Sequence, residues 1–276
     1  SFSGEVSVSR QWWLNGVVRA SGFSVASTAA ATVIACTTVA SCLLVRRWYW
    51  RCLIFSSAAY ALWLTAQRGS LAAFIVVVLL TAMPYVAGLR PLPVYQHKLL
   101  KMFLLLASCA CAGGPLVTYA AGWLQDVGGA YASIADRAGR VWPDAIDHFL
   151  HEINPLIGDG IGSVGAAAAF TPGLDPTLPD NLFLYLLLNF GALTFLIIYY
   201  VTRRIVAARA NKTSVLGLSL VLLLVTNGVT ANIVENVAAM CFLGIGLGLT
   251  IHAANDPGQW RGPVNRKPLS HMQPKR

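Results

Sequence analysis

Seven long apolar segments dominate this sequence and leave few folds open to it. A transmembrane helix needs ~20 largely apolar residues. Hydrophobic residues make up 56% of the chain and charged residues only 11%, whereas about a quarter of a soluble domain is usually charged. The sequence therefore predicts an all-α, polytopic membrane helical bundle with about seven transmembrane helices. The expected spans are Ser24–Val45, Tyr49–Ala66, Gly69–Leu89, Leu99–Tyr119, Asn181–Val201, Ser214–Thr230 and Ile233–His252.

Charge assigns the loops between these segments to two sides of the membrane. If the loops after the first, third and fifth spans are cytoplasmic, together with the C-terminal tail, that side holds 15 of the 20 lysines and arginines. This bias is what the positive-inside rule requires. We expect one transmembrane domain over residues 1–252 and a basic, disordered cytoplasmic tail over residues 253–276. An external N-terminus before an odd number of spans indicates the C-terminal part of a longer protein.

The longest external loop, residues 120–180, contains one predicted helix, Val141–Ile153. On one face of it apolar residues recur at helical spacing, and polar residues fill the opposite face. We expect this amphipathic helix to lie against the membrane or to cap the bundle. The apolar positions are Trp142, Ile146, Phe149 and Ile153.

Several classes of function lack their sequence signals. The basic residues form no continuous stripe and accompany no recognition motif, so we expect no nucleic-acid partner. The six cysteines lie in or beside apolar segments without CxxC spacing and are interpreted as small buried hydrophobes. His148, His151 and Glu152 have a metal-like spacing, but the polar face of the predicted helix explains them equally well. We expect neither a metal nor a cofactor.

Two arginines, Arg68 and Arg19, lie on the external side, where the positive-inside rule makes arginine rare. Arg68 separates two apolar segments, and Gly69-Ser70 after it allows a helix to start or a ligand to approach closely. Both could be interfacial anchors. Alternatively, because guanidinium groups bind phosphate oxygens bidentately, the pair could bind a diphosphate in the outer leaflet.

Asp180 and Asn181 open the fifth predicted span at its external end. Either residue type is preferred as a helix N-cap. A carboxylate at the mouth of a bundle, facing arginines, could also act as a general base toward a sugar hydroxyl. The two roles are compatible, and both stay open.

Four short motifs follow one another along the chain, all on the predicted external side. They are Arg-Ala-Ser-Gly-Phe (Arg19–Phe23), Thr-Ala-Gln-Arg-Gly-Ser (Thr65–Ser70), Asn-Pro-Leu-Ile-Gly-Asp-Gly-Ile-Gly (Asn154–Gly162) and Asp-Asn-Leu-Phe-Leu-Tyr-Leu-Leu-Leu-Asn-Phe-Gly-Ala-Leu (Asp180–Leu193). Through their order, spacing and common sidedness, the chain resembles the O-antigen ligase and polysaccharide polymerase superfamily of bacterial inner membranes. The similarity covers the chain from about Arg19 to His252.

The resemblance implies a metal-independent glycosyltransferase that uses an undecaprenyl-diphosphate-linked glycan donor at the periplasmic face. The acceptor would be a second glycan or a lipid-linked acceptor. Arg19 and Arg68 would bind the carrier diphosphate and stabilise it as the leaving group, with Asn181 beside them in substrate binding. Ligases commonly carry histidine where this chain has Asp180, which favours an O-antigen or exopolysaccharide polymerase, with Asp180 as a candidate base. A ligase, a multi-span transporter and a noncatalytic assembly subunit are the alternatives.

Overall fold

Helices make up nearly all the regular structure of the computed structural model, which describes residues 12–14, 17–19, 27–45, 47–81, 93–121, 136–161, 163–164 and 180–255. A short antiparallel hairpin precedes them, formed by β1 (Trp12–Leu14) and β2 (Val17–Arg19). The expected all-α class is therefore confirmed apart from this hairpin.

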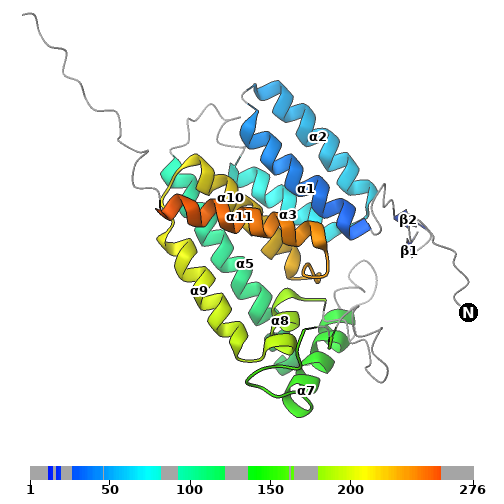
Figure 1. Ribbon diagram of the computed structural model, residues 1–276. Coiled ribbons are helices and arrows are strands. Elements are labelled where there is room, and N and C mark those ends of the chain that lie inside the picture. Colours follow the sequence, from blue (N-terminus) through cyan, green and yellow to red (C-terminus); the bar gives the residue numbers. More distant parts are fainter. Residues whose placement is uncertain are drawn as a thin grey trace, which may run out of the picture.

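The main bundle surrounds one central helix, α10 (Lys212–Gly228). Nearly all of α10 is buried, including its run Leu218–Leu224. Where Gly217 lies, α10 approaches the backbone of α11 so closely that a Cβ would come within 2.6 Å of the Gly246 carbonyl oxygen. Small residues permit such close helix packing. The helices that contact α10 include α1 (Ser27–Leu44), α3 (Arg68–Thr81), α5 (Pro93–Ala121) and α11 (Val237–Asn255), and α2 (Trp48–Leu64) packs outside α1 and α3 (Figure 1).

At one end of the bundle, the described parts of α3, α5 and α9 meet next to loops that the charge pattern assigns to the cytoplasm. There, Lys101 Nζ of α5 donates to the carbonyl oxygens of Val206 and Ala208, at 2.8 and 3.0 Å, beyond the last turn of α9 (Leu193–Ala207). Gln96 of α5 donates to the Thr81 carbonyl oxygen at the end of α3. The beginning of α5 thus lies beside the ends of α3 and α9. The membrane faces themselves stay a prediction.

The fifth predicted span, Asn181–Val201, is not one continuous helix, and that prediction is wrong. The structure has a buried helix α8 (Leu182–Phe190) and a separate α9, with a break at Gly191, whose φ is 53°. The backbone of the preceding loop lies against this break: a Cβ on Gly191 would lie 2.5 Å from Gly158 N. Glycine permits both the positive φ and the close approach.

Two described helices, α1 and residues Val94–Ala120 of α5, are long and apolar enough to cross a membrane. Helices α3, α10 and α11 contain shorter apolar stretches, which are Arg68–Thr81, Lys212–Gly228 and Val237–His252 respectively. Residues 82–89, the last part of the third predicted span, lie outside the described residues, as do residues 256–276 of the predicted tail. The seven-span bundle is therefore not confirmed.

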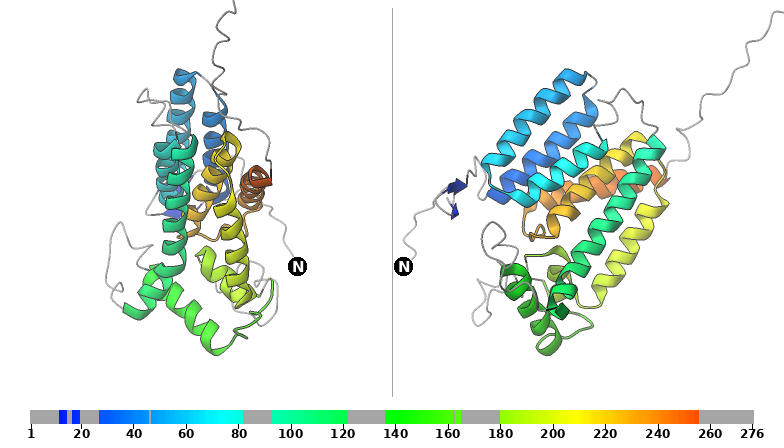
Figure 2. Two further views of the ribbon diagram at one scale, coloured as in Figure 1. Left: turned by 90° about the vertical axis from the view of Figure 1, so that its left-hand side faces the viewer. Right: turned by 180° about the vertical axis from the view of Figure 1, so that it is seen from behind.

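The predicted amphipathic helix is present, and its apolar face caps the bundle. It begins with a π-helical stretch, η2 (Arg137–Val141), which continues into α7 (Trp142–His151). Trp142, Ile146 and Ile153 are buried in a second apolar core with residues of α5 and α8. The helices α5 and α9 both reach this end of the molecule (Figure 2). Of the two expected positions for this helix, the structure selects the cap.

We predict that Gly191→Ala destabilises the protein more than Gly160→Ala does. Both glycines have positive φ, at 53° and 90°, so each substitution carries a backbone cost of about 1–3 kcal/mol. Only the Cβ at residue 191 meets backbone atoms, because nothing lies within 4 Å of a Cβ at residue 160. Overpacking should add about 1–3 kcal/mol. Thermal unfolding in detergent measures the difference, and equal losses for the two variants would contradict the predicted clash.

Candidate functional site

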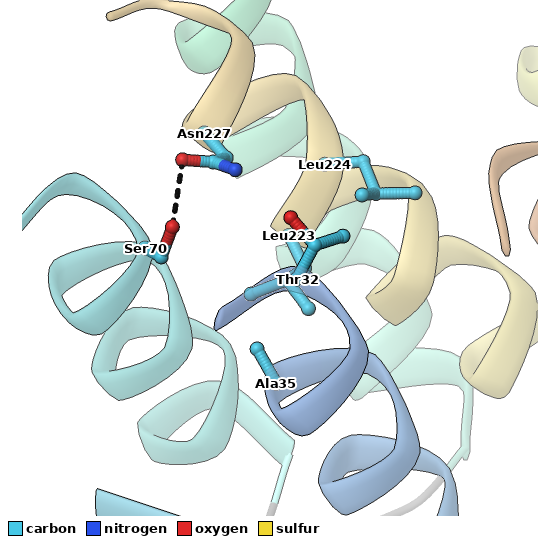
Figure 3. A pocket seen from close by; sticks show the side chains of 6 residues that line it. All are labelled: Thr32, Ala35, Ser70, Leu223, Leu224 and Asn227. Carbon is cyan, nitrogen blue, oxygen red and sulfur yellow. Dashed lines mark hydrogen bonds between the residues drawn. The ribbon is translucent and has the colours of Figure 1, made fainter. Parts of the chain in front are cut away.

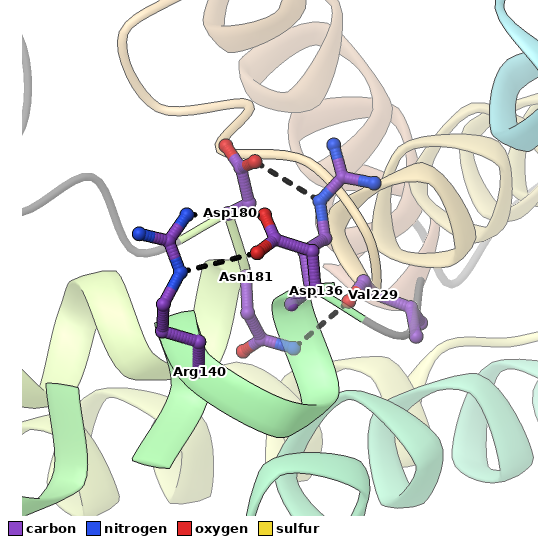
Figure 4. A network of polar contacts seen from close by, with 6 residues as sticks. Asp136, Arg140, Asp180, Asn181 and Val229 are labelled. Carbon is purple, nitrogen blue, oxygen red and sulfur yellow. Dashed lines mark hydrogen bonds and ion pairs between the residues drawn. The ribbon is translucent and has the colours of Figure 1, made fainter. Parts of the chain in front are cut away.

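An ion pair between Arg137 and Asp180 lies at the start of α8 (Figure 4). The guanidinium Nε donates to Asp180 Oδ2 at 2.9 Å, and the two side chains are 25% and 40% exposed. Arg137 is the first residue of η2, and π-helical turns often occur at functional sites. The partly exposed pair joins the segment after α5 to the residue that the sequence offers as a candidate base.

A second pair lies on the same helical stretch, nearer to solvent. Arg140 Nε donates to Asp136 Oδ1 at 3.1 Å, one turn apart. This hydrogen bond from the Arg140 guanidinium raises the pKa of Arg140. Both partners are exposed, so the pair contributes little to stability. It is a matched neighbour against which the Arg137–Asp180 pair can be compared.

Asn181 is fully buried and joins three helices. Its side-chain oxygen accepts from Leu184 N at 3.0 Å, which caps α8. Its amide nitrogen donates to the carbonyl oxygens of Cys111 in α5 and of Val229 after α10, both at 3.0 Å. The capping role that the sequence left open is confirmed for Asn181. A direct contact between this amide and a substrate would have to displace one of these bonds, and substrate binding by Asn181 stays a prediction.

Arg68 is the exposed first residue of α3, and the turn before it is fixed to two other helices. Ala66 has a positive φ of 53°. Gln67 Nε2 donates to Ser27 Oγ of α1 at 2.9 Å, and Ser70 Oγ donates to Asn227 Oδ1 of α10 at 3.0 Å. Arg68 therefore extends from an anchored turn, at the same end of the bundle as Asn181.

Arg19 is the last residue of β2 and pairs with Trp12 across the hairpin. Its side chain lies outside what the structure describes. Of the two arginines predicted to bind a diphosphate, Arg19 is therefore described by its backbone alone, and Arg68 by both its backbone and its side chain. The expected meeting of Arg19 with Arg68 stays a prediction.

A small polar cavity lies behind Arg68, inside the bundle. Thr32, Ser70 and Asn227 supply its polar groups (Figure 3). It has room for about one water molecule. A sugar does not fit, so this cavity is not the substrate site. Its remaining lining residues are Ala35, Leu223 and Leu224.

In each of the two histidines of α7, ring nitrogen Nδ1 contacts an oxygen atom one helical turn away. His148 Nδ1 lies 2.9 Å from Glu152 Oε2, and His151 Nδ1 lies 2.9 Å from the Asp147 carbonyl oxygen. Within the described ranges, no three His, Cys, Asp or Glu side chains are grouped as metal ligands. The interpretation of His148, His151 and Glu152 as the polar face of a helix fits these contacts.

Sequence reasoning missed Arg137. The same charge count that selected Arg68 also left Arg137 among the five basic residues on the external side. Arg137 lies in a predicted loop, away from the predicted spans, so no sequence feature besides its charge marked it as a site residue. Only the fold shows that it contacts Asp180, 43 residues later.

Comparison with known proteins identifies no relative. No family model matches the chain, and neither the curated proteins nor the solved structures contain a match. The functional argument therefore depends on the residues of this chain and their geometry.

We predict that Asn181→Ala destabilises the protein more than Asn211→Ala does. Each asparagine caps a helix, and losing a cap costs about 0.5–2 kcal/mol. Asn211 caps α10 within a local capping box, whereas Asn181 also binds Cys111 and Val229. The buried carbonyl oxygen of Cys111, left without this donor, should cost about 1–3 kcal/mol, and the half-buried carbonyl oxygen of Val229 should cost less. Thermal unfolding of both variants in one detergent measures the difference, and a smaller loss for Asn181→Ala would refute the three-helix role.

Proposed function

We propose that this chain is part of a multi-span membrane glycosyltransferase of a bacterial inner membrane. It would transfer glycan from an undecaprenyl-diphosphate-linked donor at the periplasmic face, as an O-antigen or exopolysaccharide polymerase. The observation that carries the proposal is the contact between Asp180 and Arg137, at the end of the bundle where Arg68 also lies. A carboxylate and several guanidinium groups at one end suit a reaction that activates a hydroxyl and releases a diphosphate.

The exposed surface of the helices supports a membrane location. Aromatic residues Trp48 and Trp50 lie exposed at one end of α2, and Tyr60 and Trp63 lie exposed at the other. Tryptophan and tyrosine are enriched at both interfaces of a membrane. Leu53 is exposed between these ends. This pattern supports the proposed bundle of about seven spans, beyond the two helices that meet the length criterion.

Two of the motifs that carry the family resemblance bind each other, which also supports the proposal. The loop Asn154–Gly160 lies against the end of α8: Asp159 N donates to the Leu188 carbonyl oxygen at 2.9 Å, and Gly160 N donates to that of Asn189 at 3.1 Å. Ala192 N donates in turn to the Pro155 carbonyl oxygen at 2.8 Å. The two motifs thus form one structural unit, in which the loop closes the end of α8 opposite Asp180.

In the proposed reaction, Asp180 accepts the proton of the acceptor hydroxyl as that oxygen attacks the anomeric carbon of the donor glycan. A new carbon–oxygen bond forms, and the bond from the anomeric carbon to the diphosphate oxygen breaks. The electron pair leaves with the diphosphate, whose developing charge Arg68 and Arg19 stabilise. The proton then passes from Asp180 to water. Arg137 orients the carboxylate through its 2.9 Å bond.

One structural observation favours the rival class, a secondary transporter. Transporters often contain interrupted helices, and the break at Gly191 separates α8 from α9. The polar groups at this break bind the loop Asn154–Gly160 rather than a second interrupted helix. We therefore keep the glycosyltransferase as the proposed function and use activity to separate the two.

We predict that Arg68→Lys and Asp180→Asn both abolish most glycan transfer by the full protein supplied with a lipid-diphosphate oligosaccharide. Loss of a general base typically costs about 10²–10⁴-fold in rate, and lysine lacks the bidentate geometry of arginine toward phosphate. Arg140→Lys is the control, because Arg140 bonds only one turn away, to Asp136, among the contacts that the structure describes. Product length and yield on gels are the readout. Unchanged transfer in Asp180→Asn would remove the base role, and wild-type protein without any transfer would contradict the enzyme.

We also predict that Arg137 acts through Asp180. Arg137→Gln should lower the rate in the wild-type background, because the carboxylate loses its 2.9 Å partner. It should have little further effect in Asp180→Asn, since residues that act as one unit are not additive. Rates of the two single variants and the double variant measure this coupling. Additive losses would mean that Arg137 serves the reaction independently of Asp180.

A further inference from the structure

Helix α9 presents a long run of apolar side chains to its surroundings. Its surface ends at Arg203 and Arg204, and the Arg204 guanidinium carbon lies 5.1 Å from the centre of the Tyr200 ring. In water, an apolar face of this size is rare on a protein without a partner. In the proposed membrane protein, on which this inference rests, lipid covers it. The exposed residues are Leu193, Phe195, Leu196, Ile197, Ile198, Tyr199 and Tyr200.

This apolar surface is too short to cross a bilayer. From Leu193 to Val201, a helix that rises 1.5 Å per residue covers only ~14 Å, whereas the hydrocarbon core is ~30 Å thick. Arg203 and Arg204 can extend toward the headgroups and recover a few ångström. The rest of the lipid-facing surface must come from whatever adjoins the first turn of α9.

The neighbour of that first turn is the loop Asn154–Ile161, which is bound to it through the hydrogen bond from Ala192 N to the Pro155 carbonyl oxygen. The apolar side chains of this loop point outward. Leu156 is 68% exposed, Ile157 61% and Ile161 84%. The apolar surface of α9 therefore continues into the loop.

Four backbone N–H groups of the loop are paired with oxygen atoms of the protein. Gly158 N donates to the Asn154 carbonyl oxygen, and Asp159 N and Gly160 N donate to carbonyl oxygens of α8. Leu156 N donates to Asn154 Oδ1. Irregular backbone is tolerated at membrane depth only when its polar groups are satisfied in this way.

The exposed apolar surface of helix α5 extends to the same end of the molecule as the loop, and this observation is independent of α9. A Cβ on Gly114 would lie 3.8 Å from the ring of Trp142, so this part of α5 lies beside α7. Leu116 and Val117, two and three residues after Gly114, are exposed and apolar. The apolar surface of α5 thus reaches the level of the cap formed by α7 and the loop.

We propose that the loop Asn154–Ile161 inserts Leu156, Ile157 and Ile161 into the outer leaflet and completes the lipid-facing surface of α9. The partner is the bilayer itself. The loop then belongs to the membrane interface and not to the aqueous part of the long external segment. Lipid held against it lies directly beside the unit formed by α8 and the loop.

Fluorescence quenching at single sites tests this proposal. The full protein would carry p-azidophenylalanine at residue 157, coupled to an environment-sensitive fluorophore, in nanodiscs of phosphatidylglycerol and phosphatidylethanolamine. Residue 197 of α9 is the lipid-facing control, and residue 152, exposed on the polar face of α7, is the aqueous control. Residue 161 is a second site, since its side chain is the more exposed of the two isoleucines.

We expect lipids with a shallow spin label to quench the probe at residue 157 and at residue 161, and aqueous iodide to leave both unquenched. The probe at residue 152 should show the reverse. Quenching of residues 157 and 161 by iodide alone, with residue 197 quenched by lipid, would overturn the insertion and leave the membrane protein intact. Quenching of residue 197 by iodide as well would overturn both.

Discussion

The pairing of backbone polar groups without help from water is the constraint on which the rest of this structure depends. It favours helices for the apolar segments and explains how the interruption in the fifth segment is tolerated. The break at Gly191 leaves carbonyl oxygens of α8 without helical donors, and the loop Asn154–Gly160 supplies donors to Leu188 and Asn189. At the other end of α8, Asn181 caps the first turn. Both ends of a short buried helix are therefore closed by protein.

The candidate site follows from this closure. Asp180 precedes the cap directly, so the bonds that fix Asn181 to α5 and α10 also fix the position of the carboxylate. Arg137 reaches it because η2 and α7 pack their apolar face over α5 and α8. Packing and capping thus place a partly exposed carboxylate beside a guanidinium. The proposed chemistry uses groups that the fold already holds in position.

Hydropathy and periodicity predicted most of the helices, and the reasons for the failures are physical. The apolar stripe of α7 repeats at helical spacing, so its position was readable from Trp142 and Ile146. The break at Gly191 was not, because a glycine inside an apolar run changes hydropathy little and is common in membrane helices. Residue preference at caps pointed to Asn181. The contact of Arg137 with Asp180 joins residues 43 positions apart, and no local pattern encodes such a pair.

The bond from Asn181 to the Val229 carbonyl oxygen also constrains the order of assembly. These partners are 48 residues apart, and α9 and α10 lie between them in the chain. During synthesis, α8 leaves the ribosome before the helix that completes its cap. Its buried face, which includes Leu184 and Leu188, packs in a core with residues of α5 and α7, which come earlier in the chain. The bond to Val229 is therefore a late step, because it forms only after α9 and α10 have been synthesised.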